Sequence, residues 1–180
     1  MRSHKPYSNV TFTKRVDHDG GMRRPSRAPR EPRVCDRCGA TYAGRRWALP
    51  PGSYERVLDL KPRTGGVVLC PGCRRVDAGV AGGYLTLSGT FVTAHADELL
   101  ALLRHEAAHA LEDNPTARVM SWSRSARQIR LTTTGPHLAQ RLGRAVARAY
   151  AGAARYDFSH ENQLARVSWQ RPATGARPVR

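Results

Sequence analysis

The sequence predicts an α+β protein in which a small four-cysteine zinc ribbon is followed by a two-layer domain of antiparallel sheet with two helices. Three observations lead to this prediction. All four cysteines lie in two C-x2-C pairs, two later segments have the hydrophobic period of an amphipathic helix, and shorter strand-like segments alternate with them. This order places both helices on one face of the sheet. With residues 84–88 as a first strand, it approaches a ferredoxin-like arrangement.

Composition divides the chain into four parts. Residues 1–33 are rich in arginine and proline and have neither helical nor strand period, so they are expected to form a disordered basic arm. The zinc ribbon is predicted at residues 34–82 and the α+β domain at residues 83–170. Residues 171–180 are expected to form a second disordered tail.

The charge of the chain indicates the class of its partner. It has 180 residues, of which 40% are hydrophobic, and its 30 lysines and arginines against 14 acidic residues give a net charge of +16. Such a balance favours a polyanion, and nucleic acid above a membrane surface. No apolar run is long enough to span a bilayer, and the basic N-terminus lacks the apolar segment of a secretory signal. A cytoplasmic protein is therefore expected.

The cysteines have the spacing of a zinc ribbon. They are Cys35, Cys38, Cys70 and Cys73, with 31 residues between the two pairs. Each C-x2-C turn can place two thiolates at adjacent vertices of a zinc tetrahedron, and two such turns complete a closed site of four sulfur ligands. A disulfide pair and a dithiol redox site are the alternatives, but a redox C-x2-C usually occurs singly within a βαβ unit. Because a closed shell leaves no position for a substrate, we expect one structural zinc ion.

Basic and aromatic side chains alternate between the two cysteine pairs. Tyr42 is followed by the run Arg45, Arg46 and Trp47, a mixture that suits the stacking of nucleic-acid bases. A small ribbon also uses such side chains to cover its limited core. The sequence does not decide between these two interpretations.

The α+β domain is expected to begin with a short strand within residues 83–92. An amphipathic helix follows from about Asp97 to Leu111, and its apolar stripe consists of Leu99, Leu100, Leu103, Ala107, Ala110 and Leu111. The remaining predicted elements are a hairpin with strands at 118–123 and 127–134, a second helix over 136–150, and two strands around 156–158 and 165–169.

The first predicted helix contains an H-E-x-x-H pattern at residues 105–109. On a helix, His105 and His109 stand one turn apart and can bind zinc while Glu106 activates a water molecule. A zinc metalloprotease is therefore the enzyme alternative. However, both histidines fall opposite the apolar stripe and no third ligand is evident, so we interpret the pattern as a solvated helix face. The phosphate-binding pattern G-x-x-x-x-G-K-[ST] is also absent, and we expect neither a nucleotide cofactor nor catalysis.

The second predicted helix carries an arginine stripe, defined as Arg141, Arg144 and Arg148, with Arg155 beyond its end. Residues at i, i+3 and i+7 share a helix face, so three guanidiniums can follow consecutive phosphates. The plain alternative is a solvated surface. The helix itself bears no acidic residue to neutralise these arginines, and the phosphate-binding interpretation is favoured.

Several short runs extend the pattern beyond the cysteines: LCPGCRR at 69–75, GGYLTLSG at 82–89, TTT at 132–134, HLA at 137–139 and RVSW at 166–169. Over roughly residues 34–171 they resemble a bacterial zinc-ribbon family of unassigned function, whose members are sometimes labelled ATPase. That family is similar to the N-terminal zinc-ribbon region of the archaeal and eukaryotic nuclear-export adaptor of the large ribosomal subunit. The resemblance implies zinc ligation by the four cysteines and binding to ribosomal RNA.

Together these patterns lead to the hypothesis of a non-catalytic zinc-ribbon protein that binds structured RNA on the ribosome, in large-subunit assembly or in the protection of idle ribosomes. The predicted contacts are the arginine stripe with Arg155, together with Arg45, Arg46 and Trp47. Besides the metalloprotease, a zinc-stabilised scaffold for protein partners is a third class of function. That class predicts binding that is insensitive to salt.

Overall fold

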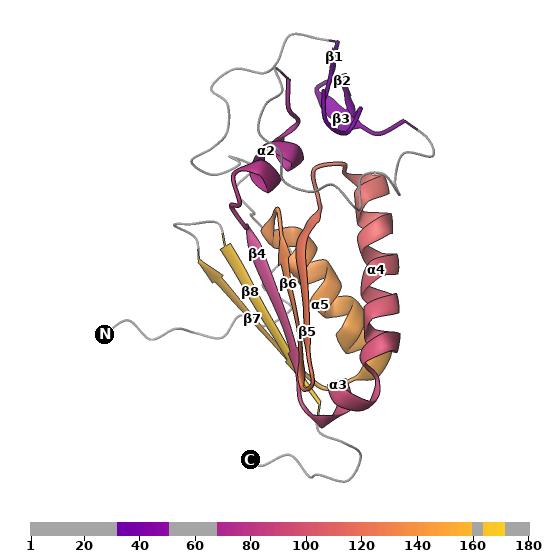
Figure 1. Ribbon diagram of the computed structural model, residues 1–180, viewed down its shortest axis with the longest axis vertical. Helices are drawn as coiled ribbons and strands as arrows, with labels where there is room; N and C mark the ends of the chain where they lie inside the picture. The colour runs from indigo at the N-terminus through magenta and orange to yellow at the C-terminus, as the bar shows by residue number, and fades with distance from the viewer. Residues whose placement is uncertain (1–31, 51–67, 160–163, 172–180) are drawn as a thin grey trace, which may run out of the picture.

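The computed structural model describes residues 32–50, 68–159 and 164–171. The chain forms a small sheet and a short helix at one end, and a larger sheet backed by helices below them (Figure 1). The predicted basic arm and C-terminal tail lie almost entirely outside the described residues. The described helices include none that is long and apolar enough to cross a membrane.

The ribbon is built from three short antiparallel strands and one helix. The strands are β1 (Arg33–Val34), β2 (Thr41–Ala43) and β3 (Arg46–Ala48), in the order β1-β2-β3. Gly44 and Arg45 connect β2 to β3 with φ angles of 56° and 61°, the positive pair that a two-residue hairpin turn requires. The helix α2 (Pro71–Asp77) begins at the second cysteine pair, with Pro71 in its first turn, where the missing amide hydrogen costs nothing.

The larger sheet has five strands: β4 (Gly83–Ser88), β5 (Val119–Ser125), β6 (Gln128–Thr133), β7 (Ala153–Ser159) and β8 (Leu164–Gln170). Their order is β5-β6-β4-β8-β7. Three of the pairings are antiparallel, as expected, but β8 runs parallel to β4. This departure from a purely antiparallel sheet arises because β8 turns back from β7 and inserts between β7 and β4.

The α+β class is confirmed, and the topology explains its ferredoxin-like character. A crossover through α4 (Ala96–Asp113) joins β4 to β5, and β6 fills the space between these strands. A second crossover through α5 (Pro136–Tyr150) joins β6 to β7. This is the split βαβ pattern of a ferredoxin-like unit, with β8 inserted as a fifth strand between β4 and β7.

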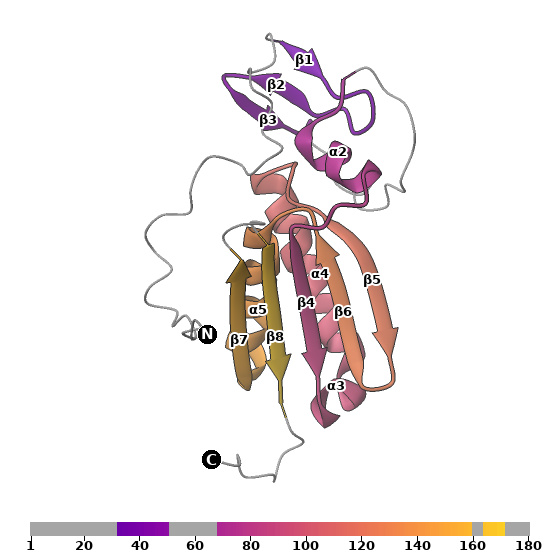
Figure 2. The same ribbon diagram turned by 90° about the vertical axis from the view of Figure 1, so that its left-hand side faces the viewer.

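Both long helices cover the same face of the sheet, and the other face is left open (Figures 1 and 2). The whole predicted stripe of α4 is buried. The largest side chains of the core between the layers are fully buried and include Leu85, Leu99, Leu142 and Trp169. Gly143 lets α5 approach the sheet closely, because a Cβ there would lie 2.5 Å from Val167.

Two short helices were not predicted. The Cys-Pro-Gly-Cys run, expected as a turn, forms the start of α2 because Cys70 caps the helix and Pro71 fits its first position. The residues that follow the predicted strand at 84–88, for which no helix was predicted, form α3 (Thr90–Ala94). Gly89 has a φ of 107°, a left-handed conformation that ends β4 and turns the chain into this helix.

Candidate metal centre

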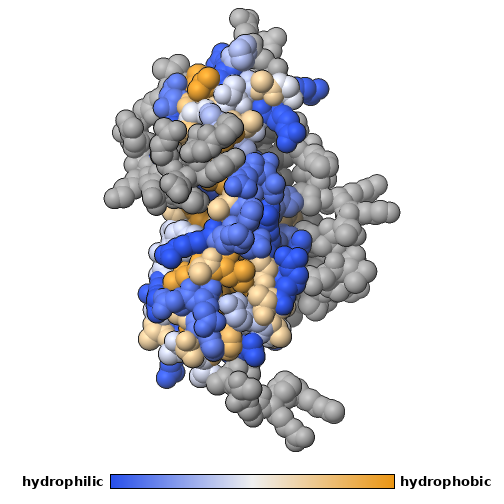
Figure 3. Space-filling model, turned by 90° about the vertical axis from the view of Figure 1, so that its right-hand side faces the viewer, coloured by the Kyte–Doolittle hydropathy of each residue, from blue (hydrophilic) through white to orange (hydrophobic). Residues whose placement is uncertain are grey.

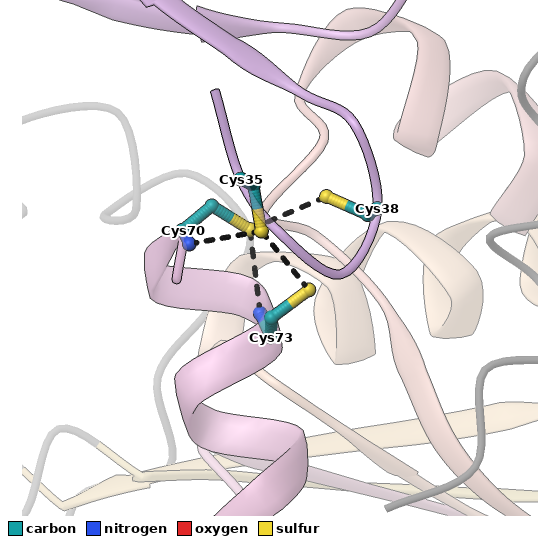
Figure 4. Close-up of side chains that lie close together, drawn as sticks. All are labelled: Cys35, Cys38, Cys70 and Cys73. Atoms are coloured by element: carbon teal, nitrogen blue, oxygen red, sulfur yellow. Dashed lines mark hydrogen bonds between the residues drawn. The ribbon is translucent and has the colours of Figure 1, made fainter. Parts of the chain in front are cut away.

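The four cysteines come together between the ribbon sheet and α2 (Figure 4). Cys35 and Cys38 lie on the loop that follows β1, and Gly39 closes this loop with a φ of 72°, as its place after the cysteine pair suggests. Cys70 is the N-cap of α2, and Cys73 lies in its first turn. Three of the four side chains are buried, and that of Cys38 is partly exposed.

The sulfur atoms have the separations of a tetrahedral ligand set. All four lie within 4.8 Å of one another, and the Cys35–Cys73 and Cys38–Cys70 pairs are both 3.7 Å apart. A tetrahedron with metal–sulfur bonds of about 2.3 Å has edges of about 3.8 Å. These cysteines therefore form a candidate metal-binding site. Among the residues that the structure describes, no other group of three or more possible ligands meets the same criterion.

Backbone amides support the thiolates as hydrogen-bond donors. The Cys70 amide donates to Cys35 Sγ at 3.3 Å, and the Cys73 amide donates to Cys70 Sγ at 3.4 Å. Hydrogen bonds from Cys38 and from the two other cysteines lower the pKa of Cys35. The corresponding contacts with Cys35 and the two others raise the pKa of Cys70. Four thiolates this close repel one another, and a cation at their centre is what allows all four to lose their protons.

Arg118 connects the metal centre to the α+β domain. It lies just before β5, is only 5% exposed, and its guanidinium donates to Cys73 Sγ at 3.1 Å and to Cys70 Sγ at 3.5 Å. Its Nε donates to the Pro115 carbonyl at 2.8 Å. Although burial opposes its charge, the thiolates of Cys70 and Cys73 raise the pKa of Arg118. A divalent metal with four thiolates carries a net charge of −2, which this buried cation partly offsets.

Two further contacts fix α2 against its surroundings. Arg37, between the first two cysteines, forms a buried ion pair with Asp77 at the end of α2. Gly72 packs so closely on the segment before β5 that a Cβ would lie 2.8 Å from the Thr116 Cα atom. Neither Gly72 nor Arg118 was predicted to take part in this centre. No local sequence pattern predicts the contacts of Gly72 and Arg118, because each joins residues that lie more than forty positions apart in the chain.

The H-E-x-x-H residues lie on the outer side of α4. His105 and His109 are both exposed, as their position opposite the apolar stripe predicted. Their Nε2 atoms are 3.1 Å apart, and His109 also approaches Glu112 at 3.3 Å. Glu106, the residue that would activate water in a metalloprotease, instead accepts a hydrogen bond from Arg141 of α5 at 3.4 Å.

The predicted RNA contacts fall in three places. Arg141 is held between α5 and α4, where it pairs with Glu106 and with Asp113 at 2.7 Å, so the acids absent from α5 are supplied by α4. Arg144 and Arg148 are exposed on α5, and Arg144 donates to Gln140 at 3.1 Å. Arg155 is exposed on β7, an edge strand of the large sheet.

In the ribbon, the aromatic pair belongs to the small core. Tyr42 is only 7% exposed, and Trp47 packs against it across β2 and β3 with ring centroids 5.2 Å apart. Trp47 also lies against the cysteine cluster. The core-covering interpretation therefore applies to Tyr42, whereas Arg45 and Arg46 are exposed beside it.

Comparison with known proteins finds no matching family model, no matching curated protein and no matching solved structure. The resemblance to the bacterial zinc-ribbon family therefore stays a prediction.

Proposed function

We propose that this protein is a non-catalytic RNA-binding protein that acts on the ribosome, with one structural zinc ion in its four-cysteine centre. The large subunit is the proposed target, either during its assembly or when ribosomes are idle. The proposal rests on charge, on the chemistry of the cysteine cluster and on the placement of the basic side chains.

The observation that carries the proposal is that arginines greatly outnumber the acidic side chains that could neutralise them, and that several of these acids are already paired within the described part of the fold. The chain has 30 basic against 14 acidic residues, and half of the eight acids among the described residues already pair with arginines: Asp77, Asp97, Glu106 and Asp113. Most of these pairs lie on or beside α4, on the face drawn in Figure 3, where hydrophilic side chains surround an apolar patch. The remaining positive charge attracts a polyanion at long range.

The cysteine cluster favours a structural role for its metal. Tetrahedral sites with four sulfur ligands hold zinc or iron, and zinc is the metal that the two C-x2-C pairs of a ribbon predict. All four positions are filled by protein sulfur, and three of the side chains are buried. A substrate would have no ligand position to enter, so the metal stabilises the ribbon and its junction with the α+β domain.

The test is co-sedimentation of the full chain with ribosomal particles on a density gradient, at low and at moderate salt. We expect the protein to travel with one subunit and to remain bound at moderate salt. Migration as free protein contradicts the proposal, and so does indiscriminate binding to every RNA that moderate salt abolishes. Binding that ignores salt and survives nuclease treatment indicates a protein scaffold instead.

The number of zinc ions separates the proposal from the metalloprotease. One zinc per chain is expected, removed by substitution of the cysteines and unaffected by His109→Ala. Two zinc ions per chain, with one lost in His109→Ala, contradict the proposal. Inductively coupled plasma mass spectrometry of the purified protein gives this count directly.

A further inference from the structure

The face of the large sheet that points away from α4 and α5 is covered by no described helix (Figure 2), and its side chains are mostly polar. Side chains alternate between the two faces of each strand. A residue that lies next to a buried core residue along a strand therefore belongs to the open face. On the central strand β4 these residues are Tyr84 and Thr86, because Leu85 and Leu87 are buried. The neighbouring strands contribute Ser121, Ser123, Arg130, Thr132, Arg155, Asp157, Arg166 and Ser168.

Tyr84 lies on the central strand of this face, one residue from the start of β4, with an arginine on each neighbouring strand. It is 39% exposed. The strand register places Arg166 of β8 directly beside it, at the strand separation of about 4.8 Å. Arg130 of β6 lies at the diagonal position on the other side, since Tyr84 pairs with Thr132. An aromatic ring thus stands between two exposed guanidiniums that reach outward from adjacent strands.

The arginines on this face form no ion pair within the part of the chain that the structure describes. Arg130, Arg155 and Arg166 are exposed, and the described residues provide no ion pair to any of them. Asp157 stands opposite Arg166 in the register of β7 and β8. On the helix side, by contrast, Arg124 and Arg141 are each paired with carboxylates.

We propose that this open face binds a single-stranded segment of RNA, with a base stacked on Tyr84 and phosphates held by Arg130 and Arg166. The inference rests on the proposed RNA-binding function and identifies the open face as the surface that binds the RNA. A flat sheet with an exposed aromatic side chain on a central strand is suited to unpaired bases, whose faces are free to stack. Base pairs in a duplex are already stacked, so their faces cannot reach Tyr84.

The remaining polar side chains suit the same ligand. Serine and threonine hydroxyls can both donate and accept hydrogen bonds, and they cover the positions between the arginines. Thr86 and Ser168 separate Arg130 from Arg155 in one continuous row across four strands. This row crosses the sheet beside Tyr84 and lets a bound strand contact positive charge along its length.

The inference is tested by fluorescence anisotropy with a short fluorescein-labelled oligouridylate and the zinc-loaded full chain, over a range of salt concentrations. The test variant is the double substitution Arg130→Ala and Arg166→Ala. Arg144→Ala with Arg148→Ala is the comparison variant, because it removes the same charge from the arginine stripe on α5, which is the other predicted RNA-binding surface. Thermal unfolding and zinc content show whether each variant is folded.

The sheet variant should reduce the slope of log affinity against log salt by about 1.4, the value for two lost phosphate contacts on single strands. The α5 variant should reduce this slope less than the sheet variant does. Tyr84→Ala should weaken binding about tenfold, because stacking on the ring is lost. Tyr84→Phe keeps the ring and should bind as the wild type does.

The outcomes separate the two proposals. In one outcome, the wild-type protein co-sediments with ribosomal particles while the sheet variants bind the oligouridylate with unchanged affinity. That result overturns the proposal that RNA binds the open face, but it leaves the proposed RNA-binding function standing. A larger loss in the α5 variant than in the sheet variant also overturns it and places the RNA on α5. Wild-type protein that binds neither ribosomal particles nor the oligouridylate overturns both proposals.

Discussion

The ribbon and the α+β domain are stabilised in different ways. The buried cluster of the ribbon is Cys35, Ala40, Cys70 and Cys73, with a few partly buried side chains around it. The core of the α+β domain contains many fully buried leucines together with Ile129, Val146 and Trp169. A unit as small as the ribbon cannot bury enough apolar surface to fold by that means alone. We therefore expect its order to depend on a metal bound by the four cysteines, whereas the order of the domain depends on apolar packing.

The two regions are nevertheless joined through a small set of contacts. Arg118 donates from the domain to the thiolates of the ribbon, and the Arg75 side chain donates from α2 to the Thr134 carbonyl before α5. Gly72 allows close packing between them. Metal loss should therefore disturb the ribbon first and reach the domain only through this joint.

The largest expected effect is that of removing the metal. Chelation, or Cys73→Ser, should unfold the ribbon, because structural zinc contributes about 10 kcal/mol or more to the folding of such units. The α+β domain should keep its cooperative unfolding transition. Hydrogen exchange measured by mass spectrometry distinguishes the two regions, with fast exchange expected in residues 33–48 and 70–77 and protection retained in β4 and β6. Simultaneous loss of protection in both regions would show that the domain has no independent stability.

The next effect is a cavity in the apolar core of the domain. Leu85→Ala should reduce the free energy of unfolding of the domain by about 2–5 kcal/mol, because Leu85 is 0% exposed. Tyr84→Ala on the same strand is the control, and its cost should be much smaller because Tyr84 faces the open side. Urea unfolding followed by circular dichroism measures both. Zinc content should stay at the wild-type value in each variant, and its loss would contradict the separation of the two regions.

A smaller effect is expected at the joint. Arg118→Met should weaken zinc binding and destabilise the ribbon by about 2–3 kcal/mol, since two hydrogen bonds to charged thiolates are lost and the buried negative charge is no longer offset. Competition with a chromogenic chelator measures the zinc affinity. Arg74→Met is the matched control, because Arg74 is exposed beside Cys73 in the sequence. Equal effects of the two substitutions would mean that net charge, rather than the Arg118 contact, supports the metal centre.

Those features that local patterns determine could be predicted from the sequence. The C-x2-C spacing identified the ligand set, and the apolar stripe of α4 placed His105 and His109 on its exposed side. Contacts between distant segments could not be predicted. Arg118 reaches Cys73 across 45 positions, and the insertion of β8 beside β4 depends on how the last hairpin packs. The acids that engage Arg141 lie on another helix, where a search along α5 does not find them.

The smallest expected effect concerns the ion pairs of Arg141 with the acidic residues of α4. Because Arg141 and Asp113 are both partly exposed, their pairing should contribute less than about 1 kcal/mol to stability. A double-mutant cycle with Arg141→Gln and Asp113→Asn, measured by urea unfolding, isolates this coupling. If Arg141 serves mainly to hold α4 against α5, Arg141→Gln should lose this small stability and leave RNA affinity close to that of the Arg144→Gln variant. A loss of RNA affinity much larger than that of Arg144→Gln, with no coupling to Asp113, would return Arg141 to the RNA-binding surface and make its contact with α4 incidental.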